Sequence, residues 1–214
     1  LHSHQKAVQA QQDHAFDAEI TPVNVTIHHQ DTAIDTDEAP RANTSLAALQ
    51  GLKPAFKKDG SVTAGNASGL NDGAAAVILA SESAVKKYHL TPLAEWQTSA
   101  TIGLDPAVMG LGPYYAINKL FAQTGLDKDA VDLFELNEAF AGQSIACEQL
   151  LKLDDHKVNP RGGAIALGHP VGCSGARIVV TLVHEMQDLQ KQTGIASLCV
   201  GGGMGIAALL KLPN

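Results

Sequence analysis

An imidazole and a thiol stand at the ends of two apolar segments in the last quarter of the sequence. His169 lies in the glycine-containing run 159–170, and Cys199 opens the glycine-rich run 199–205 thirty positions later. Glycine lets the backbone approach a ligand closely because it has no Cβ. Asn137 adds a neutral amide after a third apolar run, 131–136. A thiol, an imidazole and an amide at strand ends suggest acyl chemistry.

Cys199 is the candidate base of this group. A thiolate can remove a proton from the methyl group of a thioester that lies within reach. A free thiol has a pKa of about 8.5, so a substantial thiolate fraction near neutrality requires a positive neighbour or donated hydrogen bonds. The imidazole of His169 and the backbone N–H groups around Gly201 could supply both. The alternative is that Cys199 is a small buried hydrophobic residue on a strand.

Asn137 has two interpretations that can both be true. It can belong to the reaction site, and it can cap a helix that begins at Glu138, since asparagine favours the position before a helix. Glu138 would then lie at a helix N-terminus, where its negative charge is favoured. The run 201–205 is a poor match to a dinucleotide-binding loop, because its spacing is not G-x-G-x-x-G and strand-like residues follow it.

Alternating apolar and amphipathic segments after Gly60 must position these residues. Apolar runs and helical spacing predict strands at 74–80, 93–102, 131–136, 195–200 and 206–212, and helices at 81–88, 112–122, 138–151 and from Ser174 to Gly194. Ser81 is the expected cap of the helix at 81–88, and Gly125 is the expected end of the helix at 112–122. The last two strands predict an antiparallel hairpin that closes a mostly parallel sheet.

Residues 1–50 are polar and rich in histidine, with one short strand expected around 23–27. The spacing of these histidines matches no zinc signature, and no cysteine or carboxylate cluster accompanies them, so we expect solvated surface histidines and no metal; they are His2, His4, His28 and His29.

The composition bounds the class of protein. The chain has 214 residues, 45% of them hydrophobic and 4% aromatic, which fits an α/β domain rich in small aliphatic residues. A net charge of −7 disfavours nucleic acid as a partner. Three cysteines argue against a disulfide framework. We see no run of eighteen apolar residues and no leader, and therefore expect no membrane span and a cytoplasmic location.

The motif blocks resemble the thiolase family. They occur in family order over nearly the whole chain from about Lys53 onward, at 53–56, 62–76, 108–113, 137–140, 159–170 and 199–205. The resemblance implies an α/β thiolase-like half with a five-stranded mixed sheet flanked by helices. It divides the chain into a remnant of the thiolase loop region at 1–57 and a C-terminal thiolase-like domain at 58–214.

The resemblance also implies an activity, in which an acetyl group passes from one acetyl-CoA to another to form acetoacetyl-CoA and free coenzyme A, or the reverse thiolysis. The coenzyme A thioester is the substrate, no cofactor is bound permanently, and the full-length protein is expected to be a homo-oligomer. His169 would deprotonate a nucleophile and hold the thioester oxygen with Asn137, while Gly201 offers a second oxyanion site. The positions expected to contact coenzyme A or the acyl group are Phe56, Ala64, Ser68, Met109 and Phe140, with Met109 equally plausible as core.

The chain departs from the family at one point. Thiolases carry their nucleophilic cysteine in a Cys-x-Ser-Gly motif of the N-terminal half, and this sequence has no such stretch in that context. Cys173 precedes Ser174-Gly175 inside another family motif, and we interpret it as a packing residue. We therefore expect a missing N-terminal thiolase half and no activity from this chain alone. Two alternatives stay open: a non-catalytic half that only folds or binds a partner, and a 3-ketoacyl-CoA thiolase of longer-chain substrates.

Overall fold

Four strands form the sheet that carries the second half of the chain. In the computed structural model, which describes residues 1–213, they are β3 (Glu95–Gly103), β4 (Leu133–Leu136), β5 (Thr193–Val200) and β6 (Met204–Lys211). Their order is β3-β6-β5-β4, with β4 and β5 parallel and the other two pairs antiparallel. The predicted α/β class and the β5–β6 hairpin are confirmed. The sheet has four strands rather than five, and it is mostly antiparallel because β3 joins the hairpin against β6.

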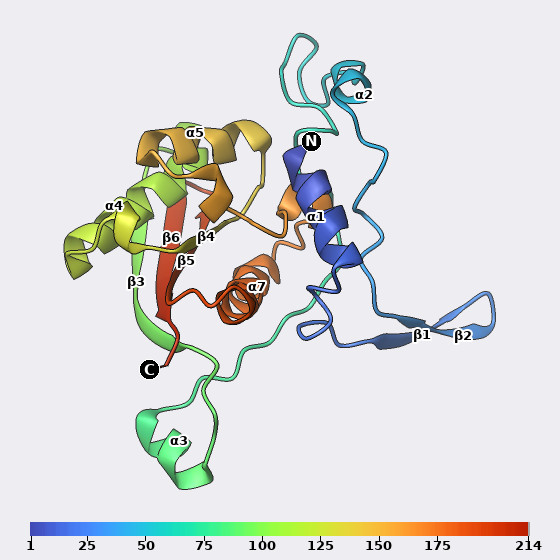
Figure 1. The fold of residues 1–214 in the computed structure, drawn as a ribbon. Helices are drawn as coiled ribbons and strands as arrows, with labels where there is room; N and C mark the ends of the chain where they lie inside the picture. The colour runs from blue at the N-terminus through green and yellow to red at the C-terminus, as the bar shows by residue number, and fades with distance from the viewer. Residues whose placement is uncertain (214) are drawn as a thin grey trace.

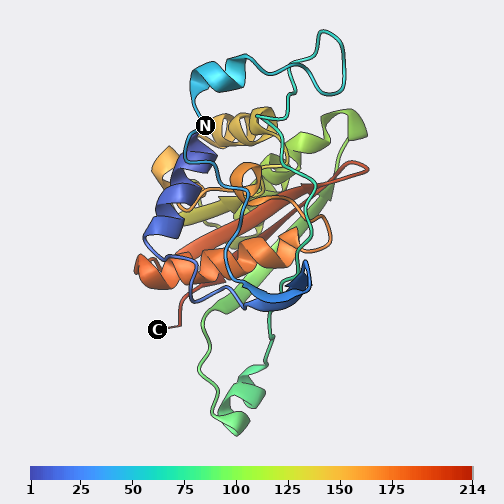
Figure 2. The ribbon, with the colours of Figure 1, turned by 90° about the vertical axis from the view of Figure 1, so that its right-hand side faces the viewer.

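Helices cover both faces of this sheet (Figure 1). The helices α4 (Gly112–Thr124) and α5 (Ala141–Leu151) lie over one face, and α7 (Ser174–Asp188) lies over the other (Figure 2). Successive strand residues point to opposite faces, so Phe134 belongs to the apolar cluster under α4 whereas Leu133 belongs to the cluster under α7. The layered core therefore fixes the direction of each side chain along β4.

The caps of two predicted helices are confirmed. The Ser81 hydroxyl accepts a hydrogen bond of 3.2 Å from Ala84 N at the start of α3 (Glu82–Tyr88), and Gly125 ends α4 at φ 72°. The prediction that Gly194 ends α7 is wrong, because the helix ends at Asp188 and Gly194 lies in β5. A Cβ on Gly194 would lie 2.7 Å from the Met186 sulfur, so glycine permits the close packing of α7 on β5.

The predicted strand at 74–80 is wrong. This segment lies extended and pairs with no strand of the described residues, and Ile78 and Leu79 are 94% and 78% exposed. An apolar run forms a buried strand only where a neighbouring strand and a covering layer exist. The segment is the long irregular connection that leads to α3 (Figure 1).

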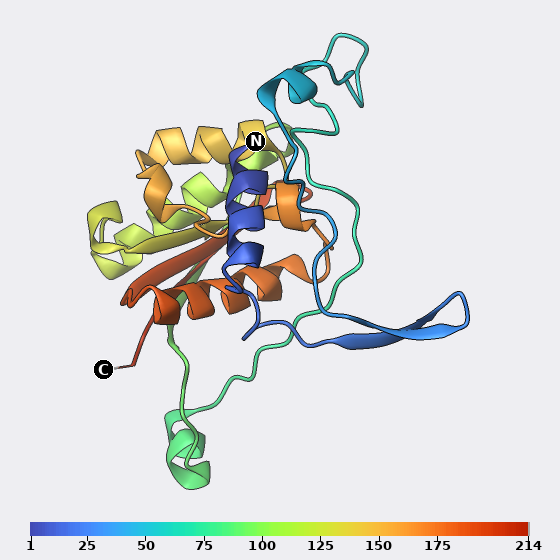
Figure 3. The same cartoon turned by 45° about the vertical axis from the view of Figure 1, so that its right-hand side comes forward.

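The first fifty residues form a helix, a hairpin and a short helix on one side of the body (Figure 3). The elements are α1 (His2–Gln12), β1 (Val23–Ile27), β2 (Gln30–Ile34) and α2 (Leu46–Gln50). The strand expected near 23–27 is confirmed as β1, and His28 and His29 form the turn to β2, both at positive φ. His4 is not a solvated histidine as predicted; it is buried, and its Nδ1 accepts a hydrogen bond of 3.1 Å from Arg41 N.

The remaining elements are short. They are η1 (Pro106–Leu111), η2 (Lys128–Ala130), η3 (Asp155–Lys157) and α6 (Ala164–Leu167). No helix of the described residues has the length and apolar character needed to cross a membrane.

Candidate active site

Asn137 and His169 meet at the carboxyl end of β4. Asn137 follows the last strand residue, is fully buried, and donates its backbone N–H to Ser197 O on the parallel neighbour β5 at 3.0 Å. His169 follows α6, and its Nε2 lies 3.4 Å from Asn137 Nδ2. The structure thus brings together two residues that are 32 positions apart in the sequence.

The capping interpretation of Asn137 is wrong. The helix α5 begins at Ala141, later than predicted, with Phe140 as its cap residue. Glu138 is therefore not at the helix start either. Its carboxylate instead accepts hydrogen bonds from the Ser3 hydroxyl at 2.6 Å and from Ile165 N at 3.1 Å, which ties the end of β4 to α1 and α6.

The His169 ring has a partner on each nitrogen. The Ser174 hydroxyl lies 2.6 Å from Nδ1 and 3.1 Å from Pro170 O, and the Asn137 amide faces Nε2. With Asn137 Nδ2 donating to Nε2, the neutral ring carries its proton on Nδ1 and donates it to Ser174 Oγ. Burial, and secondarily the positive charge of Arg177, lower the pKa of His169. The ring is thus neutral near pH 7 and can accept a proton at Nε2.

The carbonyl side of Asn137 has an open hydrogen-bonding position. Its Oδ1 is buried and has no hydrogen-bond partner among residues 1–213. Buried amide oxygens are normally satisfied, so an acceptor that receives no donor from the described protein residues favours a bound water or a ligand donor there.

Cys199 lies at the end of β5, opposite Gly205 of β6, and is 7% exposed. Burial raises the pKa of its thiol, and the described residues include no hydrogen bond from His169 or Gly201 to the sulfur. The expectation that these two groups lower the pKa is therefore wrong for this chain, and the resting thiol is neutral. Gly201 itself is exposed in the turn between β5 and β6.

Glycine is required beside Cys199. A Cβ on Gly112 would lie 2.6 Å from Met204 O and 3.3 Å from Cys199 Cα, and a Cβ on Gly205 would lie 2.3 Å from Gly112 O. The start of α4 can therefore approach the strand end that carries the thiol only because both positions lack side chains.

The predicted coenzyme A and acyl-group positions lie in two neighbouring segments, in one loop and in η1. Ser68 donates its N–H and its hydroxyl to Ala139 O at 3.0 and 3.2 Å, which places Ser68 beside Phe140. Ala64 is exposed in the same segment, Phe56 is 78% exposed in the preceding loop, and Met109 is half-buried in η1. Their role in binding coenzyme A stays a prediction.

Two partners of His169 were missed by sequence reasoning. Asn71 Oδ1 accepts a hydrogen bond of 3.3 Å from His169 N, and Asn71 leaves no room for a side chain at Gly168, whose φ is 97°. Ser174 was expected only to begin a helix. The Asn-Asp-Gly sequence at 71–73, which is typical of turns, was the sequence signal for the first, and a hydroxyl at a helix start near His169 was the signal for the second.

Cys173 is buried at the start of α7 and lies beside Gly73, as a packing residue would. Within the described part of the chain, no group of three or more His, Cys, Asp or Glu residues has an arrangement suited to a metal ion.

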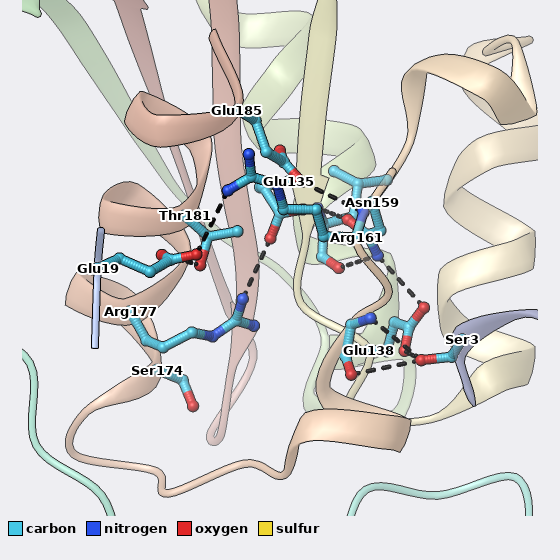
Figure 4. Close-up of polar contacts among 12 residues, drawn as sticks. Ser3, Glu19, Glu135, Glu138, Asn159, Arg161, Ser174, Arg177, Thr181 and Glu185 are labelled. Atoms are coloured by element: carbon cyan, nitrogen blue, oxygen red, sulfur yellow. Dashed lines mark hydrogen bonds and ion pairs between the residues drawn. The ribbon is translucent and has the colours of Figure 1, made fainter. Parts of the chain in front are cut away.

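A buried cluster of charges lies behind the site (Figure 4). Arg177 Nη1 donates to Glu135 Oε2 at 3.2 Å, and Arg161 Nη1 lies 3.6 Å from Glu19 Oε1. Glu185 accepts from Arg161 N at 3.3 Å. No sequence pattern marked this cluster, because Glu135 lies within an apolar strand and its partners come from distant segments.

The cluster predicts a loss of stability at alkaline pH. Burial raises the pKa of Glu135 to about 8, with Arg177 acting against the rise. Because this folded-state pKa lies above the unfolded one, the stabilisation is complete at low pH and is lost as pH rises through about 8. We expect the free energy of unfolding, measured with urea, to fall between pH 7 and 9 by about 1 kcal/mol more for the native chain than for Glu135→Gln. The exposed control Glu82→Gln should keep the native slope, and equal slopes in native chain and Glu135→Gln would contradict the account.

Comparison with known proteins places these features in a family context. The family model described as "Thiolase, C-terminal domain" matches residues 90–212, and "Thiolase, N-terminal domain" matches residues 1–83. An acetyl-CoA acetyltransferase of Escherichia coli (strain K12) is 51% identical over 214 residues, which cover 100% of this chain and 54% of that protein. A probable acetyl-CoA acyltransferase of Staphylococcus aureus (strain MRSA252) is 50% identical over 211 residues, 98% of this chain and 53% of that protein.

Solved structures agree. The Bacillus anthracis acetyl-CoA acetyltransferase superimposes with a TM-score of 0.96 at 47% identity, over 99% of this chain and 54% of that one. A human mitochondrial 3-ketoacyl-CoA thiolase in complex with CoA superimposes with a TM-score of 0.89 at 42% identity, over 99% of this chain and 53% of that one. The chain thus spans about half the length of the curated relatives it matches.

Proposed function

Because the chain belongs to the thiolase family, we propose that it supplies the base and an oxyanion site of an acyltransferase that condenses two acetyl-CoA into acetoacetyl-CoA and coenzyme A, or runs the reverse thiolysis. The observation that carries the proposal is the pair Asn137–His169 at 3.4 Å, next to a neighbouring strand, β5, that has Cys199 as its penultimate residue. The Asn137 amide oxygen is buried there and has no partner among residues 1–213. In this proposal the chain holds half of the catalytic groups, and a nucleophilic thiol comes from an N-terminal thiolase half.

The first half-reaction uses the neutral groups of the resting site. His169 Nε2 accepts the proton of the nucleophilic thiol, and the thiolate attacks the thioester carbon of the first acetyl-CoA. In this proposal the N–H of Gly201, which lies in the exposed turn between β5 and β6, donates to the oxyanion. As the coenzyme A thiolate leaves, it takes the proton of the Cys199 thiol. A thiol whose pKa is raised by burial suits this step, because it is still protonated when the leaving group needs a proton.

The second half-reaction uses the thiolate that the first one creates. Cys199 removes a proton from the methyl group of the second acetyl-CoA, and the enolate oxygen accepts hydrogen bonds from protonated His169 Nε2 and from a water held by Asn137. The carbanion attacks the acetyl-enzyme, the nucleophilic thiolate leaves and His169 returns its proton to it. Cys199 ends protonated, so each group returns to its starting state.

The exposed apolar segment supports the proposed partner. Leu70, Ile78 and Leu79 are 99%, 94% and 78% exposed along an extended stretch whose backbone pairs with no strand of the described residues. Large apolar side chains that are exposed along one stretch of chain favour an interface there. An N-terminal thiolase half would cover it by adding neighbouring strands. On the same proposal, coenzyme A contacts Ser68, Ala64, Phe56 and Phe140, and the acyl group contacts Met109.

The test identifies the product that the full-length protein containing this chain forms from acetoacetyl-CoA and coenzyme A. Acetyl-CoA as the sole acyl product, with slower cleavage of longer 3-ketoacyl-CoA, is the expected result. Faster cleavage of longer chains would make the protein a degradative 3-ketoacyl-CoA thiolase. Binding without turnover of any 3-ketoacyl-CoA would show a non-catalytic half and overturn the proposal.

A further inference from the structure

The side chains of Glu135 and Asn137 point to the same face of β4, the face covered by α7, because strand residues two apart share a face. Asn137 contacts His169, and Glu135 accepts the hydrogen bond from Arg177 of α7. The same face of β4 therefore contacts both the loop that carries His169 and the helix that follows this loop.

The first turn of α7 contacts His169 as well. Ser174 and Arg177 are three residues apart in the first turns of α7, so they lie on the same side of the helix. Ser174 Oγ lies 2.6 Å from His169 Nδ1. Arg177 Nη1 lies 3.2 Å from Glu135 Oε2, a contact that Figure 4 draws. The contacts form a closed ring that runs from β4 through His169 and Ser174 to Arg177 and back to β4.

The Arg177–Glu135 contact is shielded from water. The Glu135 side chain is 1% exposed and that of Arg177 is 20% exposed. Breaking a buried contact of this kind is costly, because the carboxyl group loses its donor without gaining water. The contact therefore favours one position of the first turns of α7 relative to β4.

We propose that Arg177, bound to Glu135, is a positioning residue that holds the Ser174 hydroxyl and the Asn137 amide on opposite nitrogens of the His169 ring. The proposal rests on the proposed function, in which His169 Nε2 must first accept a proton and then donate a hydrogen bond. If the ring turned, Nε2 would lose its alignment with the substrate oxygen. The positive charge of Arg177 also disfavours a second positive charge on the His169 ring.

The groups that act on His169 come from three packed segments. The segment before α3 contributes Asn71 through its amide oxygen, β4 contributes Asn137, and α7 contributes Ser174 and Arg177. Arg177 is the ionic group that lowers the pKa of His169, after burial. Its charge also acts on Glu19 and Asp37, which are carboxylates of the N-terminal segment.

The test measures the pKa of His169 without any assay of turnover. The Cε1 proton of each imidazole exchanges slowly with deuterium at a rate that follows the protonation of the ring, and mass spectrometry of peptides resolves His169 from the other histidines. The chain is compared with Arg177→Met, with Arg177→Lys, and with Arg161→Met as the matched control. Arg161 belongs to the same buried cluster and its side chain is 8% exposed, but it does not contact the ring partners.

We expect an upward shift of the His169 pKa and faster exchange in Arg177→Met, substantial recovery in Arg177→Lys, and native values in Arg161→Met. An unchanged His169 pKa in Arg177→Met would overturn the proposal, and so would an equal shift in Arg161→Met, since a general loosening of the cluster would then explain it. If Arg177→Met does not fold by circular dichroism, Arg177→Gln replaces it. Its amide keeps a donor for Glu135, so the expected upward shift of the His169 pKa then comes from the lost positive charge alone. A protein without thiolase activity could still give the expected shifts, so the two proposals fail separately.

Discussion

The chain by itself is expected to show no steady turnover of acetoacetyl-CoA and coenzyme A. A ping-pong acyl transfer needs a thiol that holds the acetyl group between its half-reactions. The three cysteines of the chain are all buried, and burial raises the pKa of each thiol, so none has the character of an activated nucleophile. The measurement is thiolysis of acetoacetyl-CoA by the purified chain, followed as loss of substrate and formation of acetyl-CoA.

Two controls make a negative result informative. Circular dichroism with cooperative urea unfolding must show that the chain is folded, and the full-length protein that contains it must turn over under the same conditions. Turnover by the purified chain at a rate near that of the full-length protein would contradict the requirement for a second thiol from an N-terminal half.

The second large effect is expected from Cys199→Ala in the full-length protein. The substitution removes the proposed base and leaves the nucleophile, His169 and Asn137 in place. Condensation should fall by about 10² to 10⁴, which is typical of losing a positioned general base. Acetylation of the nucleophile by acetyl-CoA should persist at a reduced rate, because the leaving coenzyme A thiolate then takes its proton from water instead of from Cys199. Cys173→Ala is the matched control, because that thiol is equally buried at 7% exposure and lies at the start of α7; it should retain native condensation.

His169→Ala provides the contrasting pattern. The same imidazole serves the nucleophile in the first half-reaction and the enolate oxygen in the second, so its loss should slow both acetylation and condensation. The two variants are told apart by mass spectrometry of the acetyl-enzyme, which should accumulate in Cys199→Ala and form slowly in His169→Ala.

The sequence was informative where local patterns and motif positions agree. The glycine turn at 201–205 between two apolar runs predicted the β5–β6 hairpin, and the structure has it. The meeting of Asn137 and His169 was predicted from the family resemblance, and the structure brings them together. The imidazole, however, follows the short helix α6 and not a strand end as predicted. Helix caps such as Ser81 were predictable because their hydrogen bonds are made within a few residues.

The sequence was misleading where the outcome depends on a distant partner. The apolar run 74–80 has the composition of a buried strand, but a strand needs a neighbour, and no described segment pairs with it. The pKa of Cys199 could not be read from its glycine neighbours, because burial of the thiol outweighs any donated hydrogen bond in this chain. The Glu135–Arg177 contact joins residues 42 positions apart, and nothing local marks either of them.

The most direct test of the account is exchange of the acetyl methyl protons in deuterated water, measured in the full-length protein with acetyl-CoA. Removal of that proton is the step of the second half-reaction that is assigned to Cys199, and it can be observed separately from acetylation of the nucleophile. The account predicts that Cys199→Ala becomes acetylated but exchanges its methyl protons about 10² to 10⁴ times more slowly than the unchanged protein. Methyl exchange at the native rate in Cys199→Ala, or failure of that variant to become acetylated, would contradict the assignment of Cys199 as the base.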